Sequence, residues 1–245
     1  LAGAIFCLEE LTKNFSPYVL MGSIAATVTA TTVTQFFFGM EPVFHMGEIP
    51  VVMAGNVYIV LILLGAFVGF LGLGFNKMLV ISLDAYAKSP LKPWQKPLVP
   101  LLAAGIIGFF LPEILGGGSP LVDALVEHEY AIGFLLLLLA GKFFFTMLCF
   151  GSGVPGGIFL PMLVLGAVGG ALFAQLAVAA NLLAPQWTVN CIVFGMAAYF
   201  SAVVKSPVTG AILIMEMTGS FQHLLSLMLV SMTAFLVAEL SISTW

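Results

Sequence analysis

Long apolar stretches recur along this sequence, and they constrain the fold more than any other feature. Of the 245 residues, 61% are hydrophobic and only 7% are charged. A soluble domain of this size needs a more charged surface, whereas a helix of about 20 apolar residues is long enough to cross a bilayer. Backbone polar groups must be paired inside the membrane, so helices are the expected spanning elements. We therefore expect an all-α, polytopic membrane protein.

The apolar stretches differ in length, which indicates a particular kind of membrane fold. The longer ones are Tyr18–Phe38, Asn56–Phe75, Leu98–Leu111, Tyr130–Phe150, Phe159–Ala180, Val189–Val204 and Leu224–Leu240. Those too short to span alone are Leu1–Leu8, Leu121–Glu129 and Val208–Met217. Half-length helices are typical of folds that place helix ends near the middle of the membrane.

The sequence also contains an internal repeat. Gly3-Ala4-Ile5, followed by Glu10-Leu11-Thr12 and Phe15, matches Gly210-Ala211-Ile212, followed by Glu216-Met217-Thr218 and Phe221, with one residue of slippage. Repeats combined with short helices are typical of inverted-repeat transport proteins. In the second copy, we expect Glu216 to be a solvated helix end.

The segment Gly151–Pro161 interrupts two strongly apolar runs. Glycine costs about 1 kcal/mol and proline about 3 kcal/mol relative to alanine inside a helix, so we expect one helix to end here and another to begin near Phe159. Pro161 suits a first helical turn, where no intrahelical N–H bond is lost. Two interpretations stay open: an anion site made of backbone amides at a helix start, or a kink that lets helices pack closely.

Charged residues give an orientation and few other signals. Four of the seven basic residues lie in Lys77–Lys96 and another is Lys13, whereas the link Gly39–Gly55 has no lysine. The positive-inside rule places the lysine sites in the cytoplasm. We expect Lys142 to snorkel toward an interface. The net charge of −4 does not indicate a nucleic-acid partner.

Two further patterns have simple interpretations. The three histidines, His45, His128 and His223, are scattered and suggest no metal site. Gly166-x-x-x-Gly170 is a pattern for close helix packing in membranes rather than a phosphate loop.

Four segments together resemble one protein family. Leu148–Pro161, with Gly156-Gly157-Ile158-Phe159-Leu160-Pro161, resembles the G-x-F-x-P region of the CLC family of chloride channels and proton-coupled chloride transporters. The other similar segments, in the expected order, are Leu1–Glu10, Phe75-Asn76-Lys77 and Ser206–Thr218. The resemblance implies a fold of two inverted halves, in which residues 1–54 end the first half (its last two helices and an outer linker) and residues 55–245 form the second.

The resemblance also implies roles for particular residues. Ile158 and Phe159, with Gly157 beside them, match positions where backbone amides hold a central chloride, which favours the anion site over the kink. Glu10 matches an internal glutamate that passes protons to and from the cytoplasm, where channels generally have an apolar residue. Glu9 is its neighbour in the proton pathway and helps to admit water. The glycine-rich loop Gly116–Ser119 matches a family loop without an assigned ligand role.

Partners follow from the resemblance as well. It implies a homodimer in membrane lipid, with Leu1–Glu10, Tyr18–Phe38, Val208–Met217 and Leu224–Leu240 at the subunit contact. The family's serine-bearing chloride loop and its G-K/R-E-G-P gating glutamate match nothing in this sequence, and its inner tyrosine falls just beyond Trp245. We therefore expect this chain to be a piece of a longer protein, which acts together with the missing N-terminal half.

The function expected from these features is proton-coupled chloride antiport in the intact protein, with chloride as the substrate and no cofactor. A passive chloride channel and a structural membrane subunit remain as alternatives. We expect no enzyme, since an intramembrane protease would need paired aspartates, a serine–histidine pair or a zinc-type histidine motif. Asp84 and Asp123, the only aspartates, lie in polar flanks.

Overall fold

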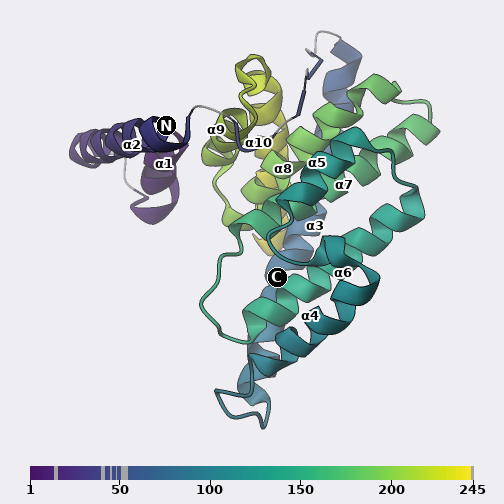
Figure 1. Ribbon diagram of the computed structural model, residues 1–245. Helices are drawn as coiled ribbons and strands as arrows, with labels where there is room; N and C mark the ends of the chain where they lie inside the picture. The colour runs from purple at the N-terminus through teal and green to yellow at the C-terminus, as the bar shows by residue number, and fades with distance from the viewer. Residues whose placement is uncertain (14–15, 40–41, 45, 48, 51–54, 244–245) are drawn as a thin grey trace.

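The protein is built from helices packed side by side, as the computed structural model in Figure 1 shows. The structure describes residues 1–13, 16–39, 42–44, 46–47, 49–50 and 55–243, and within these ranges it contains no strand. Phe15, His45 and Trp245, which the sequence analysis considers, lie outside the described residues. The helices are α1 (Ala2–Phe6), α2 (Pro17–Phe38), α3 (Gly55–Lys88), α4 (Leu98–Phe110), α5 (Ser119–Glu127), α6 (Ile132–Gly151), α7 (Phe159–Ala179), α8 (Thr188–Val204), α9 (Pro207–Thr218) and α10 (Leu224–Ser243).

Six stretches of helix in the described part of the chain are long and apolar enough to cross a membrane. They belong to α2, α3, α6, α7, α8 and α10, while α4 and α9 are shorter apolar helices. The prediction of an all-α, multi-pass integral membrane protein with helices of mixed length is confirmed.

One helix is longer than the sequence indicates. Asn56–Phe75 is only the first part of α3, which continues without a break to Lys88. Asn76 and Lys77 are polar, but polarity does not end a helix in the way that glycine or proline does, and the next proline is Pro90. The amide of Asn76 instead donates a hydrogen bond to the Val203 carbonyl (3.1 Å), so it joins α3 to α8.

Helices α7 and α8 form the centre of the molecule, and α3 and α10 pack against α8. Every residue of α7 from Met162 to Leu172 is buried. The two central helices touch backbone to backbone, because a Cβ added at Gly166 would lie 2.6 Å from the Gly195 carbonyl oxygen. The interpretation of Gly166-x-x-x-Gly170 as a helix-packing pattern is confirmed.

Helix α2 packs least against the rest of the chain, in contrast to α7 and α8. None of its residues is buried, and in Figure 1 it extends to one side of the helical body together with α1. Its apolar surface is therefore available for contact outside this chain.

The close crossing of α7 and α8 generates a stability prediction. Gly170→Ala places a Cβ against the Cys191 carbonyl, and overpacking of this kind costs about 1–3 kcal/mol. We expect a lower unfolding midpoint for the detergent-solubilised intact protein, measured by thermal scanning. Gly74→Ala is the matched control, because its added methyl meets nothing within 4 Å. An unchanged midpoint for Gly170→Ala would contradict the close approach.

Candidate functional site

The helix break predicted around Gly151–Pro161 is present. Helix α6 ends at Gly151 and α7 begins at Phe159, with Ile158 as its N-cap residue. Ser152 closes the end of α6 by donating its hydroxyl to the Cys149 carbonyl (2.6 Å). Gly153 then adopts φ +76°, a left-handed conformation that glycine reaches without steric cost. The chain leaves the helix here because its local sequence forces it to.

The start of α7 exposes unpaired backbone donors. Met162 N–H makes the first bond back to the Ile158 carbonyl (3.0 Å), and no backbone acceptor among the described residues outside the helix is paired with the N–H of Ile158 or Phe159. A Cβ added at Gly157 would meet nothing within 4 Å, so the space in front of these donors is open. Together with the dipole of the helix, they form a place where a negative charge is favoured.

Phe159 connects this helix start to the rest of the molecule. Its side chain is 37% exposed, and its ring meets the buried Phe200 ring of α8 edge-on, with 5.9 Å between centroids. Gly153–Gly157 are exposed on the surface of this chain. The open donors thus lie at the surface of this chain, on a helix whose body is fixed in the core.

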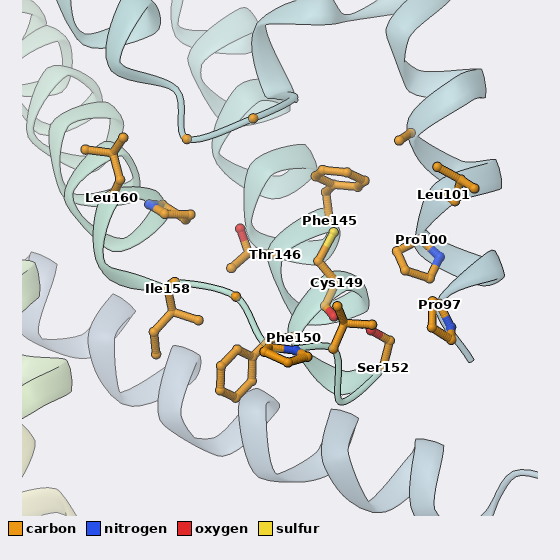
Figure 2. A pocket seen from close by; sticks show the side chains of 18 residues that line it. Pro97, Pro100, Leu101, Phe145, Thr146, Cys149, Phe150, Ser152, Ile158 and Leu160 are labelled. Carbon is orange, nitrogen blue, oxygen red and sulfur yellow. The ribbon is translucent and has the colours of Figure 1, made fainter. Parts of the chain in front are cut away.

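A cavity of about 490 Å³ lies on one side of the break, between α4, α6 and the segment that joins α6 to α7. Figure 2 shows Thr146 and Cys149 of α6 facing it, with Pro100 of α4 and its N-cap residue Pro97 opposite and Ile158 at its edge. The side chains around it are mostly apolar, so they supply no charge that could hold an ion. Any anion held near the break depends on backbone N–H groups.

Lys142 does not snorkel, and that expectation is wrong. Its side chain is 1% exposed, and its ammonium donates to the carbonyls of Ile114 (2.8 Å) and Gly116 (2.7 Å). A buried charge is costly unless it is hydrogen-bonded, and these carbonyls satisfy the ammonium inside the protein. The lysine therefore holds the glycine-rich loop against α6.

This contact explains the glycines that the sequence analysis left without a role. Gly118 has φ +89°, and a Cβ there would come within 3.1 Å of the Lys142 ammonium. A Cβ at Gly117 would collide with the Leu160 side chain at 2.5 Å. Glycine is needed so that the loop can lie between Lys142 and the first turn of α7. Sequence reasoning missed the contact between Lys142 and the glycine-rich loop because the lysine and the loop are separated along the chain.

Glu9 and Glu10 lie at a second location, where α1 meets the start of α9. A π-helical turn, Cys7–Leu11, carries both glutamates. Glu9 accepts hydrogen bonds from the Thr209 N–H (2.6 Å), the Thr209 hydroxyl (2.7 Å) and the Val208 N–H (3.1 Å). Glu10 accepts one from the Ser206 hydroxyl (3.2 Å). Both carboxylates are thus directed at the first residues of α9.

The two sets of predicted site residues are not in direct contact. Among the described residues, no hydrogen bond joins Glu9 or Glu10 to Gly157, Ile158 or Phe159. Helix α8 connects them indirectly: Phe200 contacts the Phe159 ring, and α8 packs on α9.

Glu216, expected to be a solvated helix end, also has a partner. Its carboxylate accepts a hydrogen bond from the Ala2 N–H at the start of α1 (3.0 Å), while the side chain keeps 33% of its surface exposed. The signal that could have revealed this contact is the internal repeat, because α1 and α9 carry its two copies and pack against each other.

The Lys142 contact generates a second prediction. Lys142→Met removes the donor to the carbonyls of Ile114 and Gly116, and leaving the buried Ile114 carbonyl unpaired costs about 1–3 kcal/mol. We expect a large drop in the unfolding midpoint of the intact protein in detergent. Lys88→Met, at an exposed lysine, should have little effect. Equal midpoints for the two variants would show that the loop does not depend on Lys142.

Comparisons with known proteins give matches over nearly the whole of this chain. A family model described as voltage gated chloride channel matches residues 1–239. A Vibrio campbellii protein named H(+)/Cl(-) exchange transporter ClcA is 34% identical over 249 residues, which are 98% of this chain and 52% of that protein. A Yersinia pestis protein of the same name is 31% identical over 248 residues, with 98% and 51% covered. The chain spans about half the length of these curated relatives.

Solved structures agree in fold. A slow cyanobacterial Cl-/H+ antiporter superposes with a TM-score of 0.85 at 26% identity, over 98% of this chain and 57% of that one. A CLC-type fluoride/proton antiporter superposes with a TM-score of 0.80 at 24% identity, over 97% of this chain and 58% of that one. At that identity, the second likeness is evidence for the fold alone.

Proposed function

The chain belongs to the voltage gated chloride channel family, and from this premise we propose that the intact protein exchanges chloride for protons across a membrane. The observation that carries the proposal is Glu10, a carboxylate at a position where the family's channels generally have an apolar residue. The relatives named H(+)/Cl(-) exchange transporter support the same assignment. Chloride is then the substrate, and we expect no cofactor and no enzymatic activity.

The proposed architecture has two inverted halves. Residues 1–54 would end the first half, and residues 55–245 would form the second. The repeated segments support this division, because α1 and α9 carry the two copies and pack against each other. The missing N-terminal half of the same protein would complete the structure.

The proposed chloride site is the start of α7, with Gly157, Ile158 and Phe159. Its support is the open space in front of Gly157 and the N-terminal end of a helix of 21 residues. Backbone N–H groups and the helix dipole favour an anion without placing a fixed positive charge beside it. An anion held this way can also leave, as transport requires. The first half of the protein would cover the exposed side of this site.

The proposed proton route enters through Glu10. A carboxylate repels chloride, whereas it can take up and release a proton at the cytoplasmic side. An ionisable residue in a membrane segment is a functional candidate by default, and the Ser206 hydroxyl holds the Glu10 side chain in one place. Glu9, the neighbouring residue, belongs to the same inner region.

The proton route is tested by Glu10→Gln in the intact protein reconstituted into liposomes. Glutamine keeps the shape and most of the hydrogen bonding but cannot titrate. We expect chloride flux to persist and chloride-driven proton uptake to disappear, with both fluxes measured in parallel. Unchanged proton coupling would return Glu10 to the status of an interfacial charge. A wild-type protein that never moves protons would instead be a passive channel.

We also propose a homodimer, with α1, α2, α9 and α10 at the subunit contact. The support is the exposed apolar surface of two of these helices: α2 buries no residue, and Leu225 of α10 is 70% exposed. Small hydroxyl residues along α2 suit close helix packing in lipid.

The dimer contact is tested by Leu225→Lys. A lysine in a dry helix interface leaves an unpaired charge, so we expect the intact variant to run as a monomer in size-exclusion chromatography with light scattering. Leu102→Lys on α4 is the control, because Leu102 is 69% exposed and lies outside the proposed contact. A dimeric Leu225→Lys protein would overturn this assignment.

A further inference from the structure

The two copies of the internal repeat match without a gap as far as Glu9 when Glu9, rather than Glu10, is paired with Glu216. Gly3-Ala4-Ile5 then aligns with Gly210-Ala211-Ile212, Leu1 with Val208, and Ala2 with Thr209. Glu10 is the extra residue that causes the slippage. The π-helical turn Cys7–Leu11 accommodates it, and the Thr12 N–H closes that turn on the Cys7 carbonyl (2.9 Å). Single π-helical turns of this kind are often found at functional sites.

The paired glutamates make the same contact in opposite directions. Glu9 of the first copy accepts from the N–H groups of Val208 and Thr209 at the start of α9. Glu216 of the second copy accepts from the Ala2 N–H (3.0 Å). Each helix therefore ends in a carboxylate that pairs with the first turn of the other.

Physical chemistry favours this arrangement at both ends. The first turn of a helix has N–H groups without intrahelical partners, and they need acceptors wherever water is scarce. A carboxylate supplies acceptors and is also stabilised by the positive end of the helix dipole. Ser206 does not cap α9 with its own hydroxyl, because the Val208 and Thr209 N–H groups donate to Glu9 instead. The Ser206 hydroxyl donates to Glu10.

We propose that Glu9 and Glu216 are a reciprocal pair of capping carboxylates that fastens the segment of α1 and its π-helical turn to α9. Glu9 is thereby a positioning residue: it fixes the π-helical turn on α9, which leaves the inserted Glu10 beside Ser206. Glu9 itself carries no proton. This last statement rests on the proposed function, whereas the clamp does not.

Glu9 and Glu10 differ in the hydrogen bonds that their carboxylates accept. Glu9 Oε2 accepts from both the N–H and the hydroxyl of Thr209, so a proton on that oxygen would face two donors. Glu10 accepts a single, longer bond from the described residues, from the Ser206 hydroxyl at 3.2 Å. The Glu9 carboxylate is therefore bound to the start of α9 by more and shorter hydrogen bonds than the Glu10 carboxylate is.

The test uses Glu9→Gln and Glu216→Gln in the intact protein. Glutamine keeps one acceptor oxygen but replaces the other with a donor, so we expect each variant to lower the unfolding midpoint in detergent by about 2–4 °C. In liposomes, the ratio of proton to chloride flux should stay at the wild-type value for Glu216→Gln. Glu113→Gln, at an exposed glutamate, is the control and should leave the midpoint unchanged.

A second variant keeps the test decisive if a glutamine protein folds poorly. Thr209→Val removes one donor to Glu9, so it should lower the midpoint alone and reduce the additional loss caused by Glu9→Gln. Additive losses, or an unchanged midpoint in either glutamine variant, would overturn the clamp. Loss of proton flux in Glu9→Gln at an unchanged midpoint would make Glu9 a proton carrier. A wild-type protein without proton flux would overturn the proposed exchange, while the midpoints would still decide the clamp.

Discussion

The need to satisfy backbone polar groups where water is absent governs the parts of this fold that are not continuous helix. Inside a bilayer, an unpaired N–H or carbonyl is tolerated only where it is buried in protein or lines a wet cavity. The N–H groups in the first turn of α9 donate to the Glu9 carboxylate. The carbonyls at the glycine-rich loop accept from the Lys142 ammonium. In each case a charged side chain supplies the missing partner.

The start of α7 differs from these two places. No charged side chain among the described residues bonds to the N–H groups of Ile158 and Phe159, and the segment before them is open. The helix behind it is held rigidly, because its glycines bring α7 and α8 into backbone contact. A fixed helix with an unfilled first turn is the arrangement that an anion site made of backbone amides requires.

Several elements of the fold could be predicted because their causes are local. The break at Gly151–Pro161 follows from glycine and proline, and the spanning helices follow from apolar runs of sufficient length. The end of α3 was harder to predict, because the polar residues Asn76 and Lys77 are of a type found where a helix leaves the membrane, yet the helix continues to Lys88. The repeat was visible in the sequence, but its register was not: only the π-helical turn identifies Glu10 as the inserted residue.

The sequence by itself determined the class of the protein, the positions of most helices and the location of the broken helix, because hydropathy and backbone propensity act over a few neighbouring residues. It also showed a glutamate near the end of each copy of the repeat. Only the tertiary structure decided which partners the charged side chains have. Lys142 donates to a carbonyl of the glycine-rich loop region, at Ile114, and Glu9 accepts from the Thr209 N–H of α9, 200 residues further along the chain. These partners are set by helix packing, which no short segment of the sequence encodes.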